Sequence, residues 1–574
     1  MGSGRRSARG CAPSGPVSRP PSSCLDARFE IGKALEENAH HILDARVKRG
    51  VFVFEAIALG VLLTFGSGCA TTRSEPEKDI CKSAAEVVSV NVGTTVRPVE
   101  RRIVGINTNY LTDHAAIRSA GQGYEHALRQ MGVKSLRYPE GEMADALAWA
   151  APPFAAPQPT LLRIGPQEWP SNDPRWVSNG RSFVNSPLNF DEFMSYTRRT
   201  GAEPTLVVAF DSMYKPATPG GTAPTKQQLL DAAVAWVRYA NITQGYGVKY
   251  WEIGNESYVN NSNGGAQAYD YARDLVEFAQ AMKAVDPTIL IGANGPDSQY
   301  ARGELDASVA WWQTVLTIAA PAIDFLAVHS YPAWEWGSYE YYRTNTPKLT
   351  GAADGATAAL AVWAPAHAQR IQIAVTEMNS ADLSKGGWSS DNNNSLGHAV
   401  VLFEMLGAHL LHPRVNMAQV WNTRWINTAT PDLWNSLDQQ NNRLATGQAV
   451  AIWGQFLQMQ MVQSTNTAMI RSFASYNSSN RQLSIFLINK DTTARRTTVS
   501  LQQYASGATG SQWSLRGKSA NDKAPLWGKV QDIASSRNAL TVNLDPVSIS
   551  VLTLTPSGGT NVQTSRQLRR GPCS

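Results

Sequence analysis

The chain has 574 residues, of which 43% are hydrophobic, and a formal net charge of +5. This hydrophobic content is enough for a packed core and excludes an intrinsically disordered protein. The small basic excess forms no continuous stripe, which argues against a nucleic-acid-binding protein, and the length indicates more than one domain.

The N-terminal region has the order of segments found in an export signal. Basic residues within 46–49 precede the apolar run VFVFEAIALGVLLTF, which is followed by GSGCATT. A charged region, an apolar region and a small-residue cleavage site follow one another in such signals. The sequence around Cys69 resembles the lipidation site of a bacterial lipoprotein. We therefore predict a protein exported from a bacterial cell, lipid-anchored at the envelope through Cys69 or secreted. The alternative is a transmembrane anchor, for which the run is short.

The two ends of the chain can be divided into segments by their composition. Residues 1–45 form an unassigned N-terminal extension, 46–69 the signal or lipoprotein segment, and 70–85 a linker. Residues 557–574 are expected to be a disordered tail. No cysteine lies within 82–572, so we expect no cysteine-based site.

The central part of the chain repeats a short apolar run, a polar loop and an amphipathic segment. Helix-like segments such as TKQQLLDAAVAWVRYAN lie between most of the apolar runs. Alternating strands and helices indicate an α/β protein with a (β/α)8 TIM barrel over residues 100–460. The eight predicted strands are 102–109, 133–139, 204–210, 248–256, 288–295, 323–332, 371–379 and 416–422.

The C-terminal part has a different pattern. Segments such as RQLSIFLINKD and SISVLTLTP alternate apolar and polar residues and are separated by turn residues. This period of two predicts a C-terminal antiparallel β-sandwich over residues 461–556. Residues 86–99 have the same character, so we expect strands from this segment to join the sandwich.

Polar and aromatic residues follow the predicted barrel strands. In a barrel enzyme the active site lies at the C-terminal ends of the strands, so their accumulation there predicts a site. The residues are Asn107, Asn109, Arg137, Asn255, Glu256, His329, Tyr331, Glu377, Asn379, Trp421 and Asn422.

Two of these residues are carboxylic acids on the fourth and seventh predicted strands. Glu256 and Glu377 should face each other across the barrel mouth. A pair of carboxyl groups, one protonated and one ionised, is what glycosidic bond hydrolysis requires. The alternatives are that Glu256 begins a helix and that Glu377 belongs to a surface ion pair.

The motif WEIGNE, followed later in the chain by VTEMN, resembles the signature of clan A retaining glycoside hydrolases. Within the clan the chain is most similar to the α-L-arabinofuranosidase branch of family 51, with relatives in families 39 and 79. The resemblance covers residues 86–556. It implies that Glu256 is the acid/base and Glu377 the nucleophile.

Further roles follow from this resemblance. Asn255 would hydrogen-bond the 2-hydroxyl of the sugar, and Tyr331 would donate to Glu377 and keep it ionised. His329 would line the same wall, and Trp421 would form a stacking platform. Tyr331 and His329 could instead be core residues without a direct role.

Strand alternation places Glu252 inside the barrel, because Trp251 and Ile253 should face the helices. A buried glutamate needs a partner, and Arg137 is our candidate for a pair beneath the site.

We also include Arg137 and Asn107 among the substrate-binding residues. The long loop at about 140–185 is rich in Pro and Trp, and loops of this length are often functional. Its residues Trp149, Trp169 and Trp176 are candidates for sugar stacking, with packing as the alternative.

One motif departs from the resemblance. Family 51 enzymes tend to carry Gly-Gly after the Arg-x-Pro of the second strand, whereas this chain has RYPEGE, with Glu140 and Glu142. The resemblance as a whole nevertheless predicts an exo-acting α-L-arabinofuranosidase on polysaccharide or oligosaccharide fragments. The alternatives are a pyranoside-specific clan member (a β-xylosidase, β-glucuronidase or endo-β-glycanase) and a non-catalytic surface carbohydrate-binding protein.

The expected partner is a carbohydrate substrate and not a nucleic acid. The sequence shows neither a metal-ligand cluster nor a Gly-rich phosphate loop, so no cofactor is expected.

Overall fold

The computed structural model describes residues 86–113, 123–150, 159–164, 177–178, 182–183, 187–215, 223–260, 264–345, 347–384, 394–425 and 434–557. Cys69, Trp169, Trp176 and the predicted export signal lie outside these ranges, so the expectations attached to them stay predictions. Within the described residues, no helix combines the length and apolar character that a membrane crossing requires.

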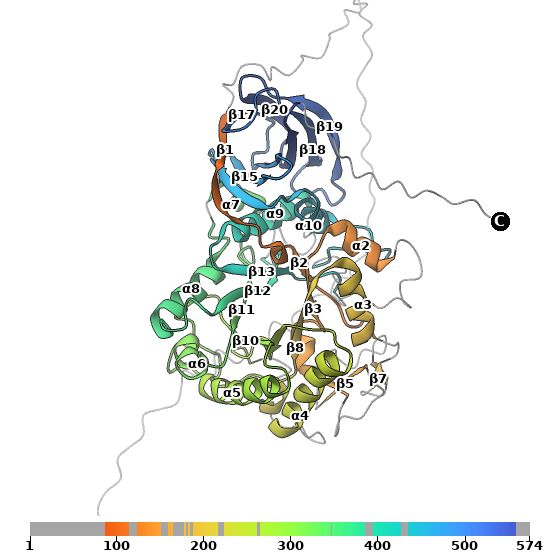
Figure 1. The fold of residues 1–574 in the computed structure, drawn as a ribbon, viewed down its shortest axis with the longest axis vertical. Coiled ribbons are helices and arrows are strands. Elements are labelled where there is room, and N and C mark those ends of the chain that lie inside the picture. Colours follow the sequence, from red (N-terminus) through yellow and green to blue (C-terminus); the bar gives the residue numbers. More distant parts are fainter. Residues whose placement is uncertain are drawn as a thin grey trace, which may run out of the picture. The chain divides into compact units, whose positions relative to one another are not determined.

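The barrel consists of eight parallel strands that close on themselves (Figure 1). Each strand overlaps one of the eight predicted ranges, so the predicted TIM barrel is confirmed. Sequence neighbours are also neighbours around the barrel, as expected for strands joined by helical crossovers. The strands are β2 (Gly105–Asn107), β3 (Ser135–Tyr138), β8 (Glu203–Val208), β9 (Tyr250–Ile253), β10 (Leu290–Gly295), β11 (Phe325–Ser330), β12 (Gln372–Met378) and β13 (Val415–Val420).

Helices surround the barrel, and local sequence signals set several of their ends. Helix α4 (Lys226–Val237) begins with a capping box formed by Thr225 and Gln228. Helix α3 (Phe190–Thr200) begins at Asn189 and ends at Gly201, which has φ +66°. The others are α2 (Tyr124–Met131), α5 (Ala268–Val285), α6 (Trp311–Ala319), α7 (Tyr339–Thr344), α8 (Gly351–Trp363), α9 (Leu396–Leu411) and α10 (Ala445–Phe456), with a π-helical turn at Arg238–Thr243.

Short elements lie between them. They are the 3-10 turns η1 (Arg101–Ile103), η2 (Glu142–Ala146) and η3 (Asp211–Tyr214), and the strand pairs β4 (Leu147–Trp149) with β5 (Leu161–Arg163) and β6 (Val177–Ser178) with β7 (Ser182–Phe183).

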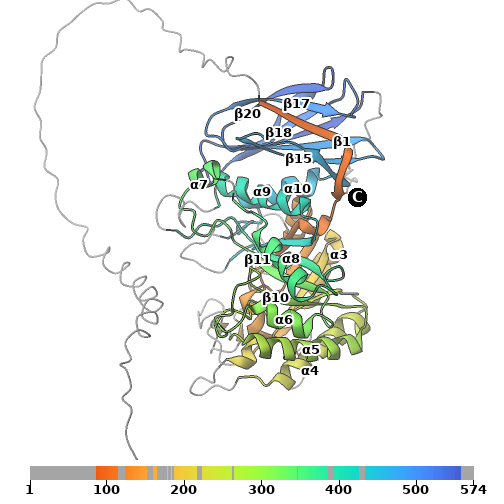
Figure 2. The same ribbon diagram turned by 90° about the vertical axis from the view of Figure 1, so that its left-hand side faces the viewer.

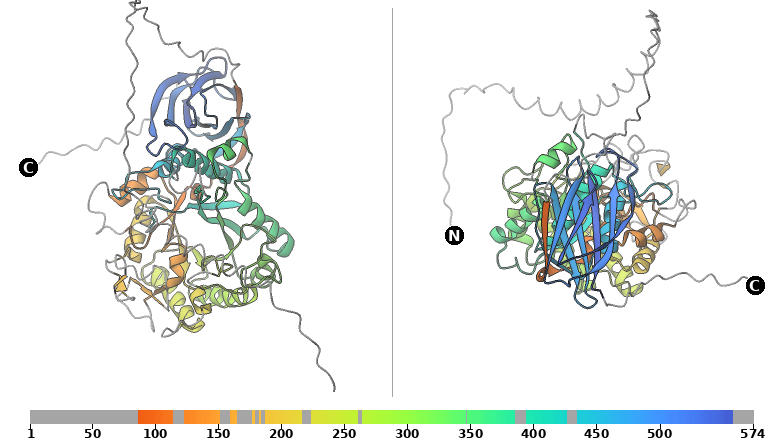
Figure 3. Two further views of the ribbon diagram at one scale, coloured as in Figure 1. Left: turned by 180° about the vertical axis from the view of Figure 1, so that it is seen from behind. Right: turned by 90° about the horizontal axis from the view of Figure 1, so that it is seen from above.

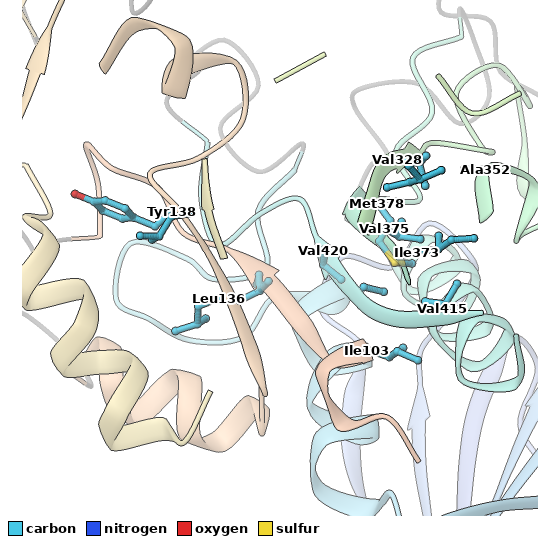
Figure 4. Packing of buried hydrophobic residues seen from close by; sticks show 14 of the residues in the cluster. Ile103, Leu136, Tyr138, Val328, Ala352, Ile373, Val375, Met378, Val415 and Val420 are labelled. Atoms are coloured by element: carbon cyan, nitrogen blue, oxygen red, sulfur yellow. The ribbon is translucent and has the colours of Figure 1, made fainter. Parts of the chain in front are cut away.

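The main hydrophobic core lies between the barrel strands and the helices (Figure 4). Trp251 and Ile253 of β9 belong to this core, and the Trp251 ring meets Trp236 of α4 edge-on at 5.6 Å. Tyr250 belongs instead to a small separate cluster with Phe325 and residues of β12 and β13. The predicted alternation of β9 is therefore confirmed.

The second domain is a nine-stranded sheet that encloses its own hydrophobic core (Figures 2 and 3). Its strands are β1 (Glu86–Pro98), β14 (Gln460–Ser464), β15 (Ile470–Asn477), β16 (Gln482–Asn489), β17 (Arg495–Gln502), β18 (Thr509–Arg516), β19 (Leu526–Ala534), β20 (Ala539–Leu544) and β21 (Ser548–Thr555). Their order is β19-β18-β21-β16-β15-β14-β1-β17-β20. The predicted β-sandwich is confirmed, with one departure from purely antiparallel pairing: β1 runs parallel to β17.

The barrel and the sandwich share a hydrophobic contact. Trp453 of α10 stacks on Phe403 of α9 at 4.6 Å between ring centroids and lies 4.2 Å from Phe486 of β16. Gly407 of α9 lies against Phe473, so closely that a Cβ there would come within 2.6 Å of the ring. These contacts fix the two domains against each other through α9 and α10.

Candidate active site

A pocket of about 220 Å³ opens at the C-terminal end of the barrel. Five predicted residues line it: Asn255, Glu256, Tyr331, Glu377 and Trp421. They come from the ends of β9, β11, β12 and β13, so four different strands converge on one site, as barrel geometry requires. The other lining residues are Glu142, Trp334, Trp425 and Trp434.

Glu377 lies at the floor of this pocket, with 7% of its side chain exposed. It receives hydrogen bonds from Arg137 Nη1 at 2.8 Å and from the Tyr331 hydroxyl at 2.7 Å, and His329 Nδ1 lies 3.4 Å away. Burial raises the pKa of Glu377 above its ordinary value, while His329, Arg137 and Tyr331 oppose that rise. The permanently charged guanidinium gives the ionised carboxylate a fixed counter-ion.

Glu256 has different surroundings. It follows β9 with φ +50°, and 30% of its side chain is exposed. Its Oε1 lies 2.7 Å from His329 Nδ1. Burial alone would raise the pKa of Glu256, but the charge and hydrogen bond of His329 outweigh it, and the pKa is lowered. Burial also opposes the charged form of His329, yet Glu377 and Glu256 together raise its pKa.

Arg137 connects the residues beneath the pocket. Its five N–H donors are all used: two bonds go to Glu252, at 2.9 and 3.0 Å, and one each to Glu377, Asn255 and Asn107. The predicted Arg137–Glu252 pair is confirmed, and the same guanidinium also reaches Glu377 at the pocket floor. Because the guanidinium is fully buried and does not line the pocket, Arg137 lies beneath the site, which corrects its prediction as a substrate-binding residue.

The prediction for Asn107 is corrected for the same reason. Asn107 is fully buried, and its amide nitrogen donates to the backbone oxygens of Thr376 and Val420 at 2.9 and 3.3 Å. Its oxygen accepts from Arg137. Asn107 therefore ties β2 to β12 and β13 below the pocket.

Trp149 is a core residue and not a sugar platform. Only 1% of it is exposed, and its ring lies parallel to Trp236 at 5.7 Å, with Phe190 and Tyr239 on other sides. The loop folds back at this point as the β4–β5 hairpin, and this places the indole against α4. The indole packs in the core because burial of its large apolar surface is favourable.

Three tryptophans of the pocket wall were missed. Trp334, which is 41% exposed, and Trp434 have ring centroids 5.9 Å apart, and Tyr331 lies 5.9 and 5.7 Å from them. Trp425 packs against Trp421 at 5.4 Å. Trp334 could have been predicted, because it follows Tyr331 closely in HSYPAWEW.

The RYPEGE segment forms one side of the pocket floor. Glu140 is buried and accepts hydrogen bonds from the amides of Asn109 and Asn422, at 2.8 and 3.3 Å. A Cβ on Gly141 would lie 2.1 Å from Glu377 Oε1, so only glycine fits there. Glu142 lines the pocket itself.

The Glu256, His329 and Glu377 side chains are close enough to be considered as metal ligands. One ligand atom from each lies within 4.8 Å of the others. However, the Arg137 guanidinium contacts Glu377 at 2.8 Å and occupies the place of a counter-ion. A further cation beside a buried guanidinium would meet strong repulsion, so the cluster is better suited to proton transfer than to metal binding.

Comparisons with known proteins show that the chain is similar to glycosidases in part of its sequence and in its fold. No family model matches the chain. Alpha-L-arabinofuranosidase C of Emericella nidulans is 26% identical over 225 residues, which are 36% of this chain and 39% of that protein. The chain therefore spans about two fifths of the length of this curated relative.

Two solved structures share the fold. The α-L-arabinofuranosidase of Thermotoga maritima, in complex with arabinose, has a TM-score of 0.62 and 19% identity, over 82% of this chain and 100% of that one. A Paenibacillus polymyxa xyloglucanase of glycoside hydrolase family 44 has a TM-score of 0.57 and 14% identity, over the same shares. The barrel-and-sandwich fold thus occurs in glycosidases with different substrates.

Proposed function

We propose that this chain is a retaining glycoside hydrolase that removes terminal α-L-arabinofuranosyl groups from polysaccharide or oligosaccharide fragments. The observation that carries the proposal is the pair Glu256 and Glu377, which have carboxylate oxygens within 4.8 Å of each other and differently built surroundings. Retaining enzymes hold their carboxyl groups about 5–5.5 Å apart, whereas inverting enzymes need about 6.5–9.5 Å.

Glu377 is suited to be the nucleophile. The hydrogen bonds from Arg137 and Tyr331 fix both of its oxygens. They leave it nearly immobile and ionised below the pocket, where attack on an anomeric carbon forms a glycosyl-enzyme bond as the bond to the leaving oxygen breaks.

Glu256 is assigned the roles of acid and then base. The lowered pKa of Glu256 favours its ionised form, so His329, whose pKa is raised, supplies the proton for the first role. Its contact with His329 at 2.7 Å holds a proton between the two groups. Transfer of this proton to Glu256 and on to the leaving oxygen completes the first step. The resulting carboxylate then takes a proton from the water that hydrolyses the glycosyl-enzyme.

Asn255 is suited to bind the sugar 2-hydroxyl. Its side-chain oxygen accepts from Arg137 Nη2 at 2.8 Å, which fixes the orientation of the amide. The NH₂ group is then left to donate to a hydroxyl in the pocket that Asn255 lines. A hydrogen bond to the 2-hydroxyl strengthens in the transition state.

The substrate proposal rests on the sequence relatives and on the size of the pocket. The relatives are named arabinofuranosidases. The pocket of about 220 Å³ is smaller than the about 300–1,000 Å³ typical of sites for drug-sized ligands, which favours a single terminal sugar.

A second candidate is a pyranoside-specific enzyme with the same mechanism. It is favoured by Glu142, because this carboxylate lines the pocket directly after the two positions where the family 51 pattern has Gly-Gly.

A screen of aryl glycosides, furanosides beside pyranosides, tests both candidates. We expect turnover of the α-L-arabinofuranoside by the wild type and a loss of about 10⁴-fold or more in Glu377→Gln. Azide should rescue Glu377→Ala and form a glycosyl azide of inverted configuration. Turnover of a xyloside or glucuronide alone would favour the second candidate, and normal activity in Glu377→Gln would overturn both.

A further inference from the structure

Two buried aspartates lie beneath the segment that carries Glu256. Asp145 belongs to η2, and Asp211 is the first residue of η3, directly after β8. Their exposed fractions are 0% and 1%. They are in direct contact, because the backbone N–H of Asp211 donates to the Asp145 carboxylate at 3.3 Å. Neither has a part in the mechanism proposed above.

The partners of the two carboxyl groups leave one oxygen on each unsatisfied. Asp145 Oδ1 accepts from the backbone N–H groups of Phe210 and Asp211, both at 3.3 Å. Asp211 Oδ2 accepts from the Ser257 hydroxyl at 2.6 Å. Within the described part of the chain, Asp145 Oδ2 and Asp211 Oδ1 are buried and have no donor. Two ionised carboxylates cannot bond to each other, whereas a proton on either group would supply the donor that the pair lacks.

The electrostatics of the pair favour the retention of that proton. Burial, and then the charge of Asp211, raise the pKa of Asp145 well above its usual range. Burial also raises the pKa of Asp211. The phenols of Tyr214 and Tyr271 interact with the pair and are neutral at pH 7. Lys215, which follows η3, has a buried ammonium group and is the nearest cation in sequence.

Asp211 contacts both sides of the segment 254–257. Besides its bond to Ser257, its Oδ2 lies so close to Gly254 that a Cβ there would come within 2.5 Å. Glu256 lies between these contacts and has φ +50°. This left-handed backbone conformation is unfavourable for a residue other than glycine, and it persists only where neighbouring contacts stabilise it.

We propose that Asp145 and Asp211 share one proton in the active enzyme and that this acid pair positions the segment carrying Glu256. Loss of the proton at alkaline pH leaves two adjacent charges in a buried place. Their repulsion displaces Asp211 and, through Ser257 and Gly254, the acid/base residue. Asp145 and Asp211 are thus positioning residues that act through Glu256.

A double-mutant cycle tests the shared proton. In Asp145→Asn or Asp211→Asn, one amide oxygen can keep the existing bonds while the NH₂ group replaces the shared proton. We expect each single variant to lose less than about 3 °C in Tm, and the double variant to lose at least about 3 °C more than the sum. The reason is that two NH₂ groups would face each other in the double variant.

The pH dependence of Tm gives a second readout. A carboxyl group with a raised folded pKa contributes stability that is complete below its ordinary pKa and is lost as the pH rises through the raised value. The wild type should therefore lose Tm between about pH 5 and 9 more steeply than either single variant. Asp274→Asn is the control, because Asp274 is buried but ion-paired with Arg273, and its pKa is lowered. That variant should keep the wild-type slope over this range.

An activity readout connects the pair to Glu256, and only this readout rests on the proposed function. With an aryl glycoside whose leaving group needs acid catalysis, the wild-type rate should fall at alkaline pH, and the fall should move to higher pH in both single variants. With a dinitrophenyl glycoside, whose leaving group needs no acid catalysis, the first step should show little of this shift. Additive losses in the cycle, together with unchanged Tm slopes, would overturn the proposal and indicate that the two carboxyl groups do not share a proton. These thermal measurements need no substrate, so their failure is separable from failure of the glycosidase assignment.

Discussion

The C-terminal end of the barrel and the interior of the sandwich are stabilised in different ways. Below the pocket, Arg137, Glu252 and Glu377 are charged and almost completely removed from water. Between the layers of the sandwich, the core is formed by aliphatic side chains such as Val88, Ile485 and Leu552.

Buried charges have to recover a large desolvation cost through their partners, whereas buried aliphatic groups gain free energy as area is removed from water. Removal of one charged side chain at the barrel end therefore leaves its partner as an uncompensated buried charge. Removal of one aliphatic side chain in the sandwich core leaves only a cavity. This difference agrees with the proposed chemistry at the barrel end and with a stabilising role of the sandwich core.

After Glu377→Gln, the largest effect is expected from Glu256→Gln, which removes the acid without adding a charge. With a poor leaving group the rate should fall by about 10²–10⁴-fold, the usual contribution of general acid catalysis. With a dinitrophenyl leaving group the first step should be nearly unchanged. Initial rates on the two substrates measure this, with Tm as the control for folding. Equal losses on both substrates would contradict the acid role.

Arg137→Met should be the most destabilising change at the barrel end. It leaves Glu252 and Glu377 buried without their counter-ion, which costs about 3–5 kcal/mol in comparable pairs. Denaturant unfolding would measure the loss. A double variant with Glu252→Met should recover part of it, because the unpaired carboxylate is then removed; no recovery would argue against the ion pair as the cause.

Leu552→Ala tests the sandwich side of the comparison. Removal of this buried side chain should cost about 2–5 kcal/mol of unfolding free energy. The kcat/KM of the folded enzyme should stay unchanged, since Leu552 belongs to the sandwich core and not to the pocket. A change in kcat/KM beyond the change in folded fraction would show that the sandwich affects catalysis.

The smallest effect concerns His329. Its pKa is raised by Glu377 and Glu256, so its contribution to stability is complete at low pH and is lost as the pH rises through the raised value. His329→Asn should therefore reduce the difference in stability between about pH 5 and 8 by roughly 1 kcal/mol or less. Denaturant unfolding at both pH values measures this, and an enlarged difference would contradict the charged form of His329.

Much of the fold could be predicted from local periodicity. The eight barrel strands were found because each is a short apolar run, and the Arg137–Glu252 pair followed from the alternation of β9. The parallel pairing of β1 with β17 could not be predicted, because it joins residues about 400 positions apart whose own patterns fit either direction.

The site was predicted in part for the same reason. Glu256, Glu377 and Tyr331 lie at or just after the C-terminal ends of β9, β12 and β11, so their convergence follows from barrel geometry. Trp149 was misplaced because a Trp in a loop rich in Pro looks exposed until the β4–β5 hairpin is known. The Asp145–Asp211 pair joins two turns, and its buried state depends on tertiary contacts that no local pattern records.

The position of β1 has a consequence for synthesis of the chain. Residues 86–91 of β1 pair with residues 497–502 of β17. The sandwich therefore cannot form completely until the whole barrel and the strands up to β17 have been synthesised. In sequence, the barrel is inserted between β1 and the other strands of the sandwich. Strand β1 therefore has no partner strand while the barrel is synthesised and folds. Such long-range pairing slows folding and leaves an exposed strand edge open to other chains. A product that ends before β17 would keep that edge exposed permanently, so premature termination should yield aggregates even when the barrel is complete.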